Sequence, residues 1–152
     1  MPKPVYIVCS MSGSEDSVTG LVSLYHVLET ILIIRRDPDP KQDFPQRFRT
    51  TAVWIRTEED DPSAEYEFES VFRHSPENTE QIVKAGQFSF GKPIFRFVVD
   101  NTFKNFPGPG VLTAIHRIRK IEEGSEWISQ EFPILLQETP PSSETLEPSE
   151  EL

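Results

Sequence analysis

The sequence contains a single cysteine, Cys9, and this scarcity excludes an intramolecular disulfide. Cys9 ends an apolar run at residues 5–9, and a lone cysteine in such a run is typical of a small buried hydrophobe. The start of the chain has no apolar stretch followed by a small-residue cleavage site, so no secretory signal is predicted. Because free thiols are usual in the reducing cytoplasm, we expect a cytoplasmic protein.

Long hydrophobic runs and an excess of positive charge are also missing. The longest apolar candidate, residues 20–34, is broken by Ser23, His26 and Glu29, and a bilayer needs roughly 18 consecutive apolar residues. Lys and Arg number 15 against 25 Asp and Glu, which gives a formal net charge of −10. Such a chain is repelled by nucleic-acid phosphates and by anionic lipid. We therefore expect neither a nucleic-acid nor a membrane partner.

Recognisable catalytic and cofactor motifs are absent as well. The sequence has no Gly-rich phosphate-binding loop and no Gly-x-Ser-x-Gly turn. The three histidines, His26, His74 and His116, lie far apart, without the short ligand spacing of a zinc site. Cys9 could act as a nucleophile only with His26 or His116 as its base, and burial would make the thiol inert. The sequence predicts no cofactor, no catalytic residue and no enzymatic activity.

What the chain does contain is a succession of short β-branched and aromatic runs between Pro, Gly and acidic turns. Apolar and polar residues alternate in residues 48–57 and, most clearly, in residues 66–74, so residues 58–64 between them are expected to form a hairpin. Residues 111–120 and 127–136 predict a second hairpin. The pattern indicates an all-β protein: an antiparallel β-sandwich, immunoglobulin-like or C2-like, of seven or eight strands with little helix.

Three segments are less clear in the sequence. Residues 10–19 predict a polar loop after the first strand. Residues 21–28 are interpreted as a strand, although their apolar residues also fall on one helical stripe, and a helical turn at residues 29–33 is the alternative. Residues 75–86 predict a loop, with one helical turn at residues 79–84 as the alternative.

The domain is expected to cover residues 1–137, and residues 138–152 are expected to form a disordered tail. The tail lacks aromatic residues and cannot offset the entropy of ordering. It carries five acids and no Lys or Arg, namely Glu138, Glu144, Glu147, Glu150 and Glu151.

Three sequence segments resemble a family of small uncharacterised bacterial β-sandwich proteins. They are Val-Tyr-Ile-Val-Cys-Ser at residues 5–10, Thr-Gly-Leu-Val-Ser-Leu-Tyr at residues 19–25, and Pro-Gly-Val at residues 109–111 before the closing hairpin. The resemblance spans most of residues 4–137 and implies a β-sandwich opened by a Thr-Gly-Leu-x-Ser strand. It implies no activity and no catalytic residues.

The stiff loop at residues 103–110 is the best candidate for a recognition surface. Phe103 and Phe106, beside Pro107 and Pro109, would lose little conformational entropy on binding a partner. The alternative is that both phenylalanines close one end of the sandwich as part of its core.

Acidic loops offer a second kind of site. Glu15 and Asp16 could meet Glu59, Asp60 and Asp61 at one end of the sandwich and together supply oxygen ligands to calcium. The alternative is an exposed acidic turn that serves only solubility and protects a sheet edge.

Basic residues near the C-terminal hairpin are expected to face acids across the sheet. Arg117 and Arg119 alternate with Ile118, and residues 65–69 offer glutamates at matching spacing.

The leading hypothesis is a non-enzymatic interaction or assembly module of unknown partner, which self-associates or binds through a sheet edge or the Phe103 loop. The alternative is a module that binds calcium or a small ligand.

Overall fold

The described part of the chain is built from β-strands alone. The computed structural model describes residues 1–34, 46–103 and 107–139, and these contain nine strands and no helix. The strands are β1 (Lys3–Glu15), β2 (Val22–Val27), β3 (Thr30–Ile34), β4 (Gln46–Ile55), β5 (Glu65–Ser75), β6 (Thr79–Ser89), β7 (Ile94–Phe103), β8 (Gly110–Lys120) and β9 (Ile128–Thr139). The described residues contain no helix that could span a membrane.

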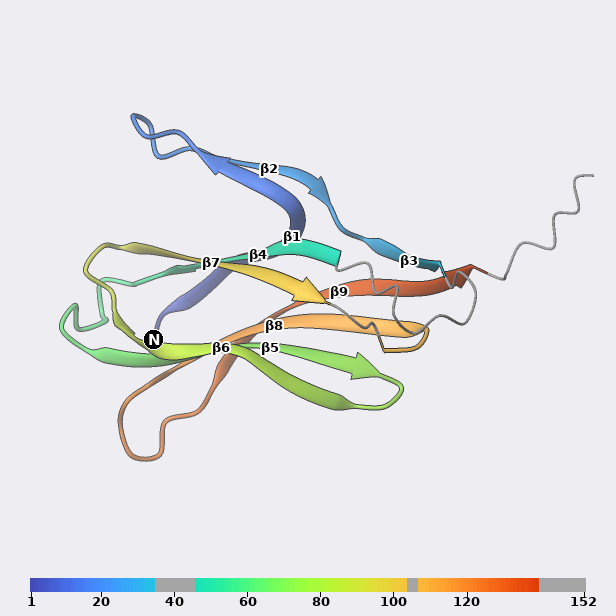
Figure 1. Ribbon diagram of the computed structural model, residues 1–152. Helices are drawn as coiled ribbons and strands as arrows, with labels where there is room; N and C mark the ends of the chain where they lie inside the picture. Colours follow the sequence, from blue (N-terminus) through green and yellow to red (C-terminus); the bar gives the residue numbers. More distant parts are fainter. Residues whose placement is uncertain (35–45, 104–106, 140–152) are drawn as a thin grey trace, which may run out of the picture.

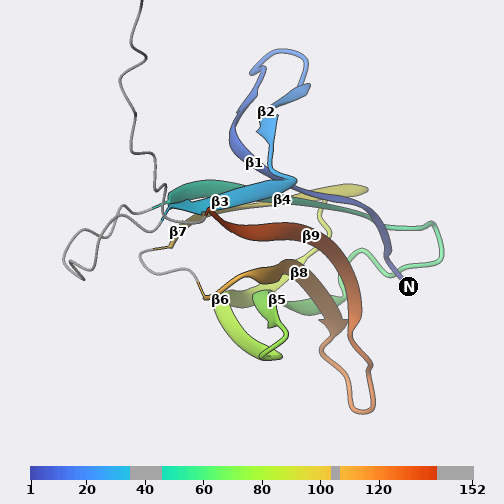
Figure 2. The same ribbon diagram turned by 90° about the vertical axis from the view of Figure 1, so that its right-hand side faces the viewer.

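The strands form two sheets that face each other. A four-stranded sheet has the order β2-β1-β4-β7, and a five-stranded sheet has the order β3-β9-β8-β5-β6. In Figure 1, β4 and β7 lie above β8, β5 and β6, and the turned view in Figure 2 shows the same two layers. The predicted β-sandwich is therefore confirmed, with nine described strands rather than seven or eight.

One strand pair is parallel, which the prediction of an antiparallel sandwich did not include. β3 pairs with β9 in parallel, from Thr30 opposite Leu135 onward. After β2 the chain crosses from one sheet to the other: the Leu28 N–H donates to the Cys9 carbonyl at 2.8 Å, and the Leu135 N–H donates to the Glu29 carbonyl at 2.9 Å. This crossing places β3 at the edge of the five-stranded sheet, beside β9.

The predicted hairpin around residues 58–64 is wrong. β4 belongs to the four-stranded sheet and β5 to the five-stranded sheet, so the acidic segment between them connects the two layers. Hydrophobic alternation identifies a strand with one buried face, but it does not identify the strand's neighbour. The predicted hairpin of residues 111–120 and 127–136 is confirmed, because β8 and β9 pair antiparallel.

The boundaries of three strands also differ from expectation. β1 continues to Glu15, through the first part of the predicted loop at residues 10–19. Residues 30–34 form a strand, not a helical turn, whereas residues 22–27 form a strand as predicted. β9 runs to Thr139, beyond the predicted domain end at Gln137, and the rest of the predicted tail lies outside the described residues.

Residues 79–86 of β6 were predicted as part of a loop, and the edge position of the strand explains the error. Among the described strands it pairs only with β5, and its residues 79–85 are exposed to solvent on both sides. A β-bulge opposite Ser70 and Val71 shifts the register within the strand. A bulged edge strand has no continuous buried face, so its sequence shows no alternation of apolar and polar residues.

The space between the sheets is filled largely by aromatic rings. Phe68 lies 4.7 Å from Phe97 between ring centroids, and Phe88 lies 4.8 Å from Phe97. At the opposite end of the core, Phe48 meets Phe72 edge to face at 5.6 Å. These contacts join β4, β5, β6 and β7 into one apolar interior.

A histidine is part of this interior. His116 on β8 has no exposed surface, and its Nδ1 accepts a hydrogen bond from the Trp54 indole N–H at 2.9 Å. The ring also packs against Phe97, with centroids 4.4 Å apart, and stacks on Phe68. Burial lowers the pKa of His116 from 6.5 to about 4, because a charged imidazolium is disfavoured among apolar rings.

The buried histidine predicts acid-sensitive stability. The unfolded chain binds a proton near pH 6.5 and the folded chain only near pH 4, so His116 costs no stability above pH 6.5. As the pH falls from 6.5 to 4, the free energy of unfolding should drop by about 3 kcal/mol through this residue. The measurement is urea unfolding across this pH range.

A His116→Gln variant is the matched comparison, because glutamine offers Trp54 an acceptor and does not titrate. Its stability should lose less over the same pH range than that of the wild type. Equal losses in both proteins would show that His116 does not cause the acid sensitivity.

Candidate functional site: the β1–β2 arm

The most prominent feature outside the two packed layers is a two-stranded ribbon. β1 pairs with β4 from Lys3 to Ser10 and with β2 from Ser10 to Glu15. Residues 11–27, called the arm from here on, therefore extend beyond the part of β1 that belongs to the sandwich. In both views the arm rises from the four-stranded sheet on the side away from the core (Figures 1 and 2).

The tip of the arm is organised by Asp16. Its Oδ1 accepts hydrogen bonds from the Val18 N–H at 2.9 Å and from the Thr19 N–H at 2.7 Å. These bonds hold the pKa of the Asp16 carboxyl below its usual value, and the bond from the Thr19 N–H has the largest effect. Gly20 takes a φ of 68°, a left-handed conformation in which glycine is unstrained, and its N–H donates to the Asp16 carbonyl at 2.9 Å.

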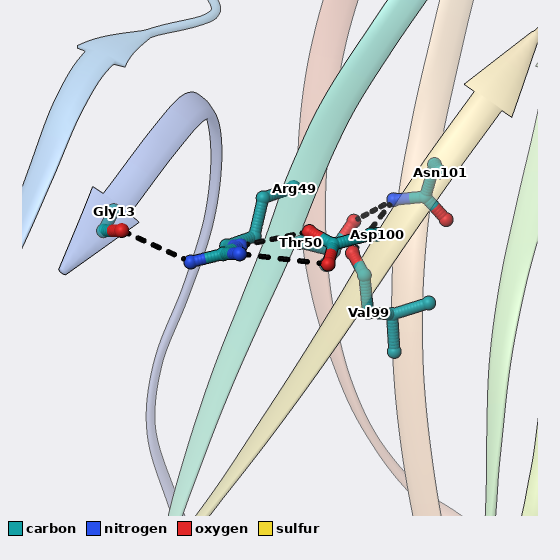
Figure 3. Close-up of polar contacts among 6 residues, drawn as sticks. All are labelled: Gly13, Arg49, Thr50, Val99, Asp100 and Asn101. Carbon is teal, nitrogen blue, oxygen red and sulfur yellow. Dashed lines mark hydrogen bonds and ion pairs between the residues drawn. The ribbon is translucent and has the colours of Figure 1, made fainter. Parts of the chain in front are cut away.

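Two arginines of the four-stranded sheet hold the arm, and Figure 3 shows the contacts of the first, Arg49. Arg49 on β4 pairs through Nε with Asp100 on β7 at 2.8 Å, and its Nη1 donates to the Gly13 carbonyl at 3.1 Å. Farther along β7, Arg96 Nη1 lies 3.3 Å from Glu15 Oε1. The arm is thus tied at two points to the outer face of the sheet.

The burial of that outer face agrees with this position. Thr51 and Val53 alternate with core residues such as Ala52, so they lie on the face of β4 turned away from the core. Both are nevertheless buried, at 1% and 4% exposure. We infer that the arm covers part of this face, since it lies above it in both views.

The arm itself has two different faces. Gly13 and Glu15 stand opposite Leu24 and Val22, and this face is turned toward the arginines, with Gly13, Leu24 and Val22 partly buried. The other face carries Ser12, Ser14, Ser23 and Tyr25, all of which are exposed; Val27 is also exposed, but it follows His26, whose φ of 54° interrupts the alternation.

Large apolar side chains lie on the exposed parts of the arm. Val18 at the tip is 92% exposed and Leu21 is 71% exposed, while Tyr25 and Val27 are about half exposed, at 49% and 51%. No Asp, Glu, Lys or Arg occurs at residues 17–28, although charged residues make up 26% of the chain. The arm therefore presents an uncharged surface with several apolar groups.

The loop proposed from the sequence as a recognition surface is partly built into the core. Phe103 stacks on Phe48 with ring centroids 5.4 Å apart and meets Phe72 edge to face at 5.0 Å. Pro107 is partly buried and Pro109 is exposed, while Phe106 lies outside the described residues. Phe103 thus occupies the core position that the sequence offered as its alternative. His74 Nε2, 2.9 Å from the Gly108 carbonyl, holds the same loop against β5.

The acidic residues proposed for calcium are engaged separately. Glu15 pairs with Arg96, and Asp16 forms the turn of the arm. Asp60 accepts a hydrogen bond from the Thr57 N–H at 2.7 Å and forms an ion pair with the amino group of Met1 at 2.5 Å. Asp61 accepts a hydrogen bond from the Ser63 N–H at 2.8 Å. The Glu59 side chain is exposed. Within residues 1–34, 46–103 and 107–139, no three His, Cys, Asp or Glu side chains are grouped as metal ligands. The geometry therefore gives the calcium hypothesis no support.

Cys9 and the histidines do not form a reactive pair in the structure. The Cys9 thiol is buried, lies 3.6 Å from Thr50 Oγ1, and has its pKa raised to about 11 by burial. His116 accepts from Trp54, and His74 binds at the Gly108 carbonyl. A thiol with so high a pKa is protonated at neutral pH and is a poor nucleophile.

The predicted pairing of basic and acidic residues across the sheet is confirmed. Arg117 pairs with Glu69 at 2.5 Å, and Arg119 pairs with Glu67, each directly opposite on β8 and β5. The Trp127 ring lies over both guanidinium groups, 4.4 Å from that of Arg119. The basic residues on this face are thus neutralised within the sheet.

The arm was not identified from the sequence as a site, although one signal was available. The uncharged stretch at residues 17–28 stands out in a chain of net charge −10. A comparison of the sequence with known protein families gives no match, and a comparison with curated proteins gives none either. The resemblance to small bacterial β-sandwich proteins therefore stays a prediction.

The arginine contacts predict how the arm responds to mutation. Arg49→Ala removes the bond to Gly13 and the ion pair with Asp100, so the arm should open more often. Amide hydrogen exchange at residues 12–15 and 22–27 should become roughly fivefold faster, and global stability should fall by less than about 1 kcal/mol.

Arg73→Ala is the control, since Arg73 makes a comparable ion pair with Glu131, at 3.3 Å, on the five-stranded sheet. It should leave exchange in the arm unchanged. Equal acceleration in both variants would show that Arg49 does not specifically hold the arm.

Proposed function

We propose that this protein is a non-enzymatic interaction module and that the exposed surface of the arm is its contact element. One observation supports the proposal most strongly: Val18, Leu21, Tyr25 and Val27 are exposed together on a ribbon without charged residues between Asp16 and Glu29. Contiguous apolar groups exposed on a soluble protein are typical of contact surfaces.

The exposed apolar side chains of the arm are not needed to hold the arm in place. A two-stranded ribbon is marginally stable on its own in water. Here the inward face and the two arginines hold the arm, so the sandwich does not require apolar residues on the outward face. A partner that covers them would gain about 25 cal/mol per Å² of apolar surface removed from water.

The free edge of β2 suggests how a partner binds. β2 is the last strand of the four-stranded sheet, and in the described part of the chain only β1 pairs with it. An edge strand can accept a further strand, whose backbone provides affinity while side-chain contacts provide specificity. The interaction hypothesis made from the sequence is thereby retained, with the contact moved from the Phe103 loop to the arm.

The location proposed is the cytoplasm. Cys9 is a buried free thiol, which is compatible with a reducing compartment.

The proposal predicts that charges on the arm abolish binding. A Val18→Asp, Tyr25→Asp double variant places two carboxylates on exposed positions and should leave the fold intact. The tagged chain is incubated with an extract that also contains an untagged copy, and retained proteins are identified by mass spectrometry. Proteins held by the wild type, further copies of this chain included, should be lost from the arm variant.

Ile82→Asp on the edge strand β6 is the matched control, because Ile82 is also exposed, at 54%. It should retain the same proteins as the wild type. If all three chains retain the same set of proteins, the arm is not the contact element and the proposal fails.

A further inference from the structure

We propose that His74 is a pH-sensitive clamp, which ties the turn between β5 and β6 to the loop residues just before β8 and holds them more tightly when its ring gains a proton. The turn is residues 76–78, and the loop residues are 107–109. In Figure 1 the turn and the start of β8 lie at the same end of the five-stranded sheet. The clamp is separate from the arm, which belongs to the other sheet, so the inference goes beyond the proposed function.

His74 is a buried residue of β5 that has a different neighbour at each ring nitrogen. Its side chain is 4% exposed. Nε2 lies 2.9 Å from the Gly108 carbonyl oxygen, and Nδ1 lies 3.5 Å from Glu77 Oε2. Nδ1 is buried and has no hydrogen-bond partner among the described residues. One imidazole therefore stands between two segments that are far apart in the chain.

The two neighbours determine where the ring hydrogens lie. A carbonyl oxygen only accepts, so Nε2 carries the hydrogen and donates it to Gly108. A neutral imidazole holds one such hydrogen, and Nδ1 is then an acceptor that faces a second acceptor, the Glu77 carboxylate. A hydrogen on Nδ1 converts this unfavourable contact into a charge-assisted hydrogen bond. Proton uptake by His74 thus strengthens the link to Glu77 and keeps the bond to Gly108.

The residues opposite His74 on the flanking strands carry no charge. Thr79 on β6 and Leu112 on β8 stand directly opposite it. The next inward-facing residues of the same two strands, Gln81 and Ala114, are uncharged as well. Neither strand therefore brings a charge against the ring.

The other elements near the ring do not bring a charge to it either. Arg73 and Glu80 stand opposite each other on the outward face of the sheet. The four-stranded sheet meets this end of β5 with two aromatic rings, those of Phe48 and Phe103. Within residues 1–34, 46–103 and 107–139, Glu77 is the carboxylate that lies within ion-pair distance of the imidazole. Burial opposes a charge on the ring, and the two acceptors at its nitrogens offset that cost.

The backbone at the start of β8 is also in close contact with the end of β5. Ser75 pairs with Val111. Gly110 has a φ of 148°, and a Cβ at this position would overlap the Ser75 carbonyl oxygen, so the approach requires glycine. Because the strands stay paired next to the ring, a weaker His74 link is expected to act locally. It should let the first residues of β8 open more often without separating the sheets.

The expected response to pH is opposite to that of His116. Histidine side chains change charge between about pH 5 and pH 8. His116 has no acceptor for a second hydrogen within the described residues, because its Nε2 is buried and unpartnered among apolar rings. His74 has one in Glu77. The start of β8 should therefore be better protected at pH 6 than at pH 8, although His116 makes the whole protein less stable in acid.

The test is amide hydrogen exchange of Gly110 and Val111 in the full chain at pH 8 and pH 6, corrected for the intrinsic pH dependence of exchange. In the wild type, the protection of both amides should rise roughly threefold at pH 6, as expected for one partly exposed ion pair. In Glu77→Gln the rise should vanish, because an amide can donate to the neutral ring and accept from the charged one. The Glu77 side chain is 60% exposed, so this variant should fold.

Glu122→Gln is the matched control, since the Glu122 side chain is 58% exposed and also forms an ion pair, with Lys120. It should keep the rise seen in the wild type. Nitrogen chemical shifts of the His74 ring give a second readout that needs no variant: at pH 8 they should identify Nε2 as the nitrogen that carries the hydrogen.

Three results would each overturn the clamp. They are equal protection at both pH values in the wild type, the same rise in Glu77→Gln as in Glu122→Gln, and a hydrogen on Nδ1 at pH 8. None of them bears on the arm, so the proposed function is tested separately.

Discussion

The structure depends on one constraint, which is that β1 pairs with different strands along its length. From Lys3 to Ser10 it pairs with β4 within the sandwich, and from Ser10 to Glu15 the one described strand that pairs with it is β2. The two pairings overlap only at Ser10, so β4 does not hold the part of β1 beyond Ser10 in the plane of the sheet. The arm exists because this change occurs within a single strand, and Arg49 and Arg96 then determine where the arm lies.

Charged side chains are distributed differently on the five-stranded sheet and on the arm of the four-stranded sheet. On the five-stranded sheet, arginines and glutamates face each other across β5 and β8, and Trp127 covers two of the guanidinium groups. The charged side chains of that face are thus paired with one another, and the face is suited to contact with water. On the arm, residues 17–28 carry no such charge, and apolar side chains are exposed instead. This difference between the two surfaces is the reason that the interaction is proposed for the arm.

Prediction from the sequence succeeded where the residue pattern within one segment is enough to identify its structure. Alternation in residues 66–74 identified β5, and the spacing of Arg117 and Arg119 correctly indicated cross-strand partners on that strand. It failed for the first part of β6, which has no buried face over residues 79–85, and for residues 58–64, which join two sheets. Phe103 was a candidate contact because sequence does not reveal that Phe48 and Phe72 surround it.

The sequence by itself determined the all-β class and the places of most strands, because strand periodicity follows from which side chains are buried on each pleated segment. It also determined the acidic charge and the uncharged stretch at residues 17–28. Only the tertiary structure decided which strands are neighbours, that β3 runs parallel to β9, and that the arm is held over the outer face by arginines. These features depend on contacts between residues far apart in the chain, which local periodicity does not encode.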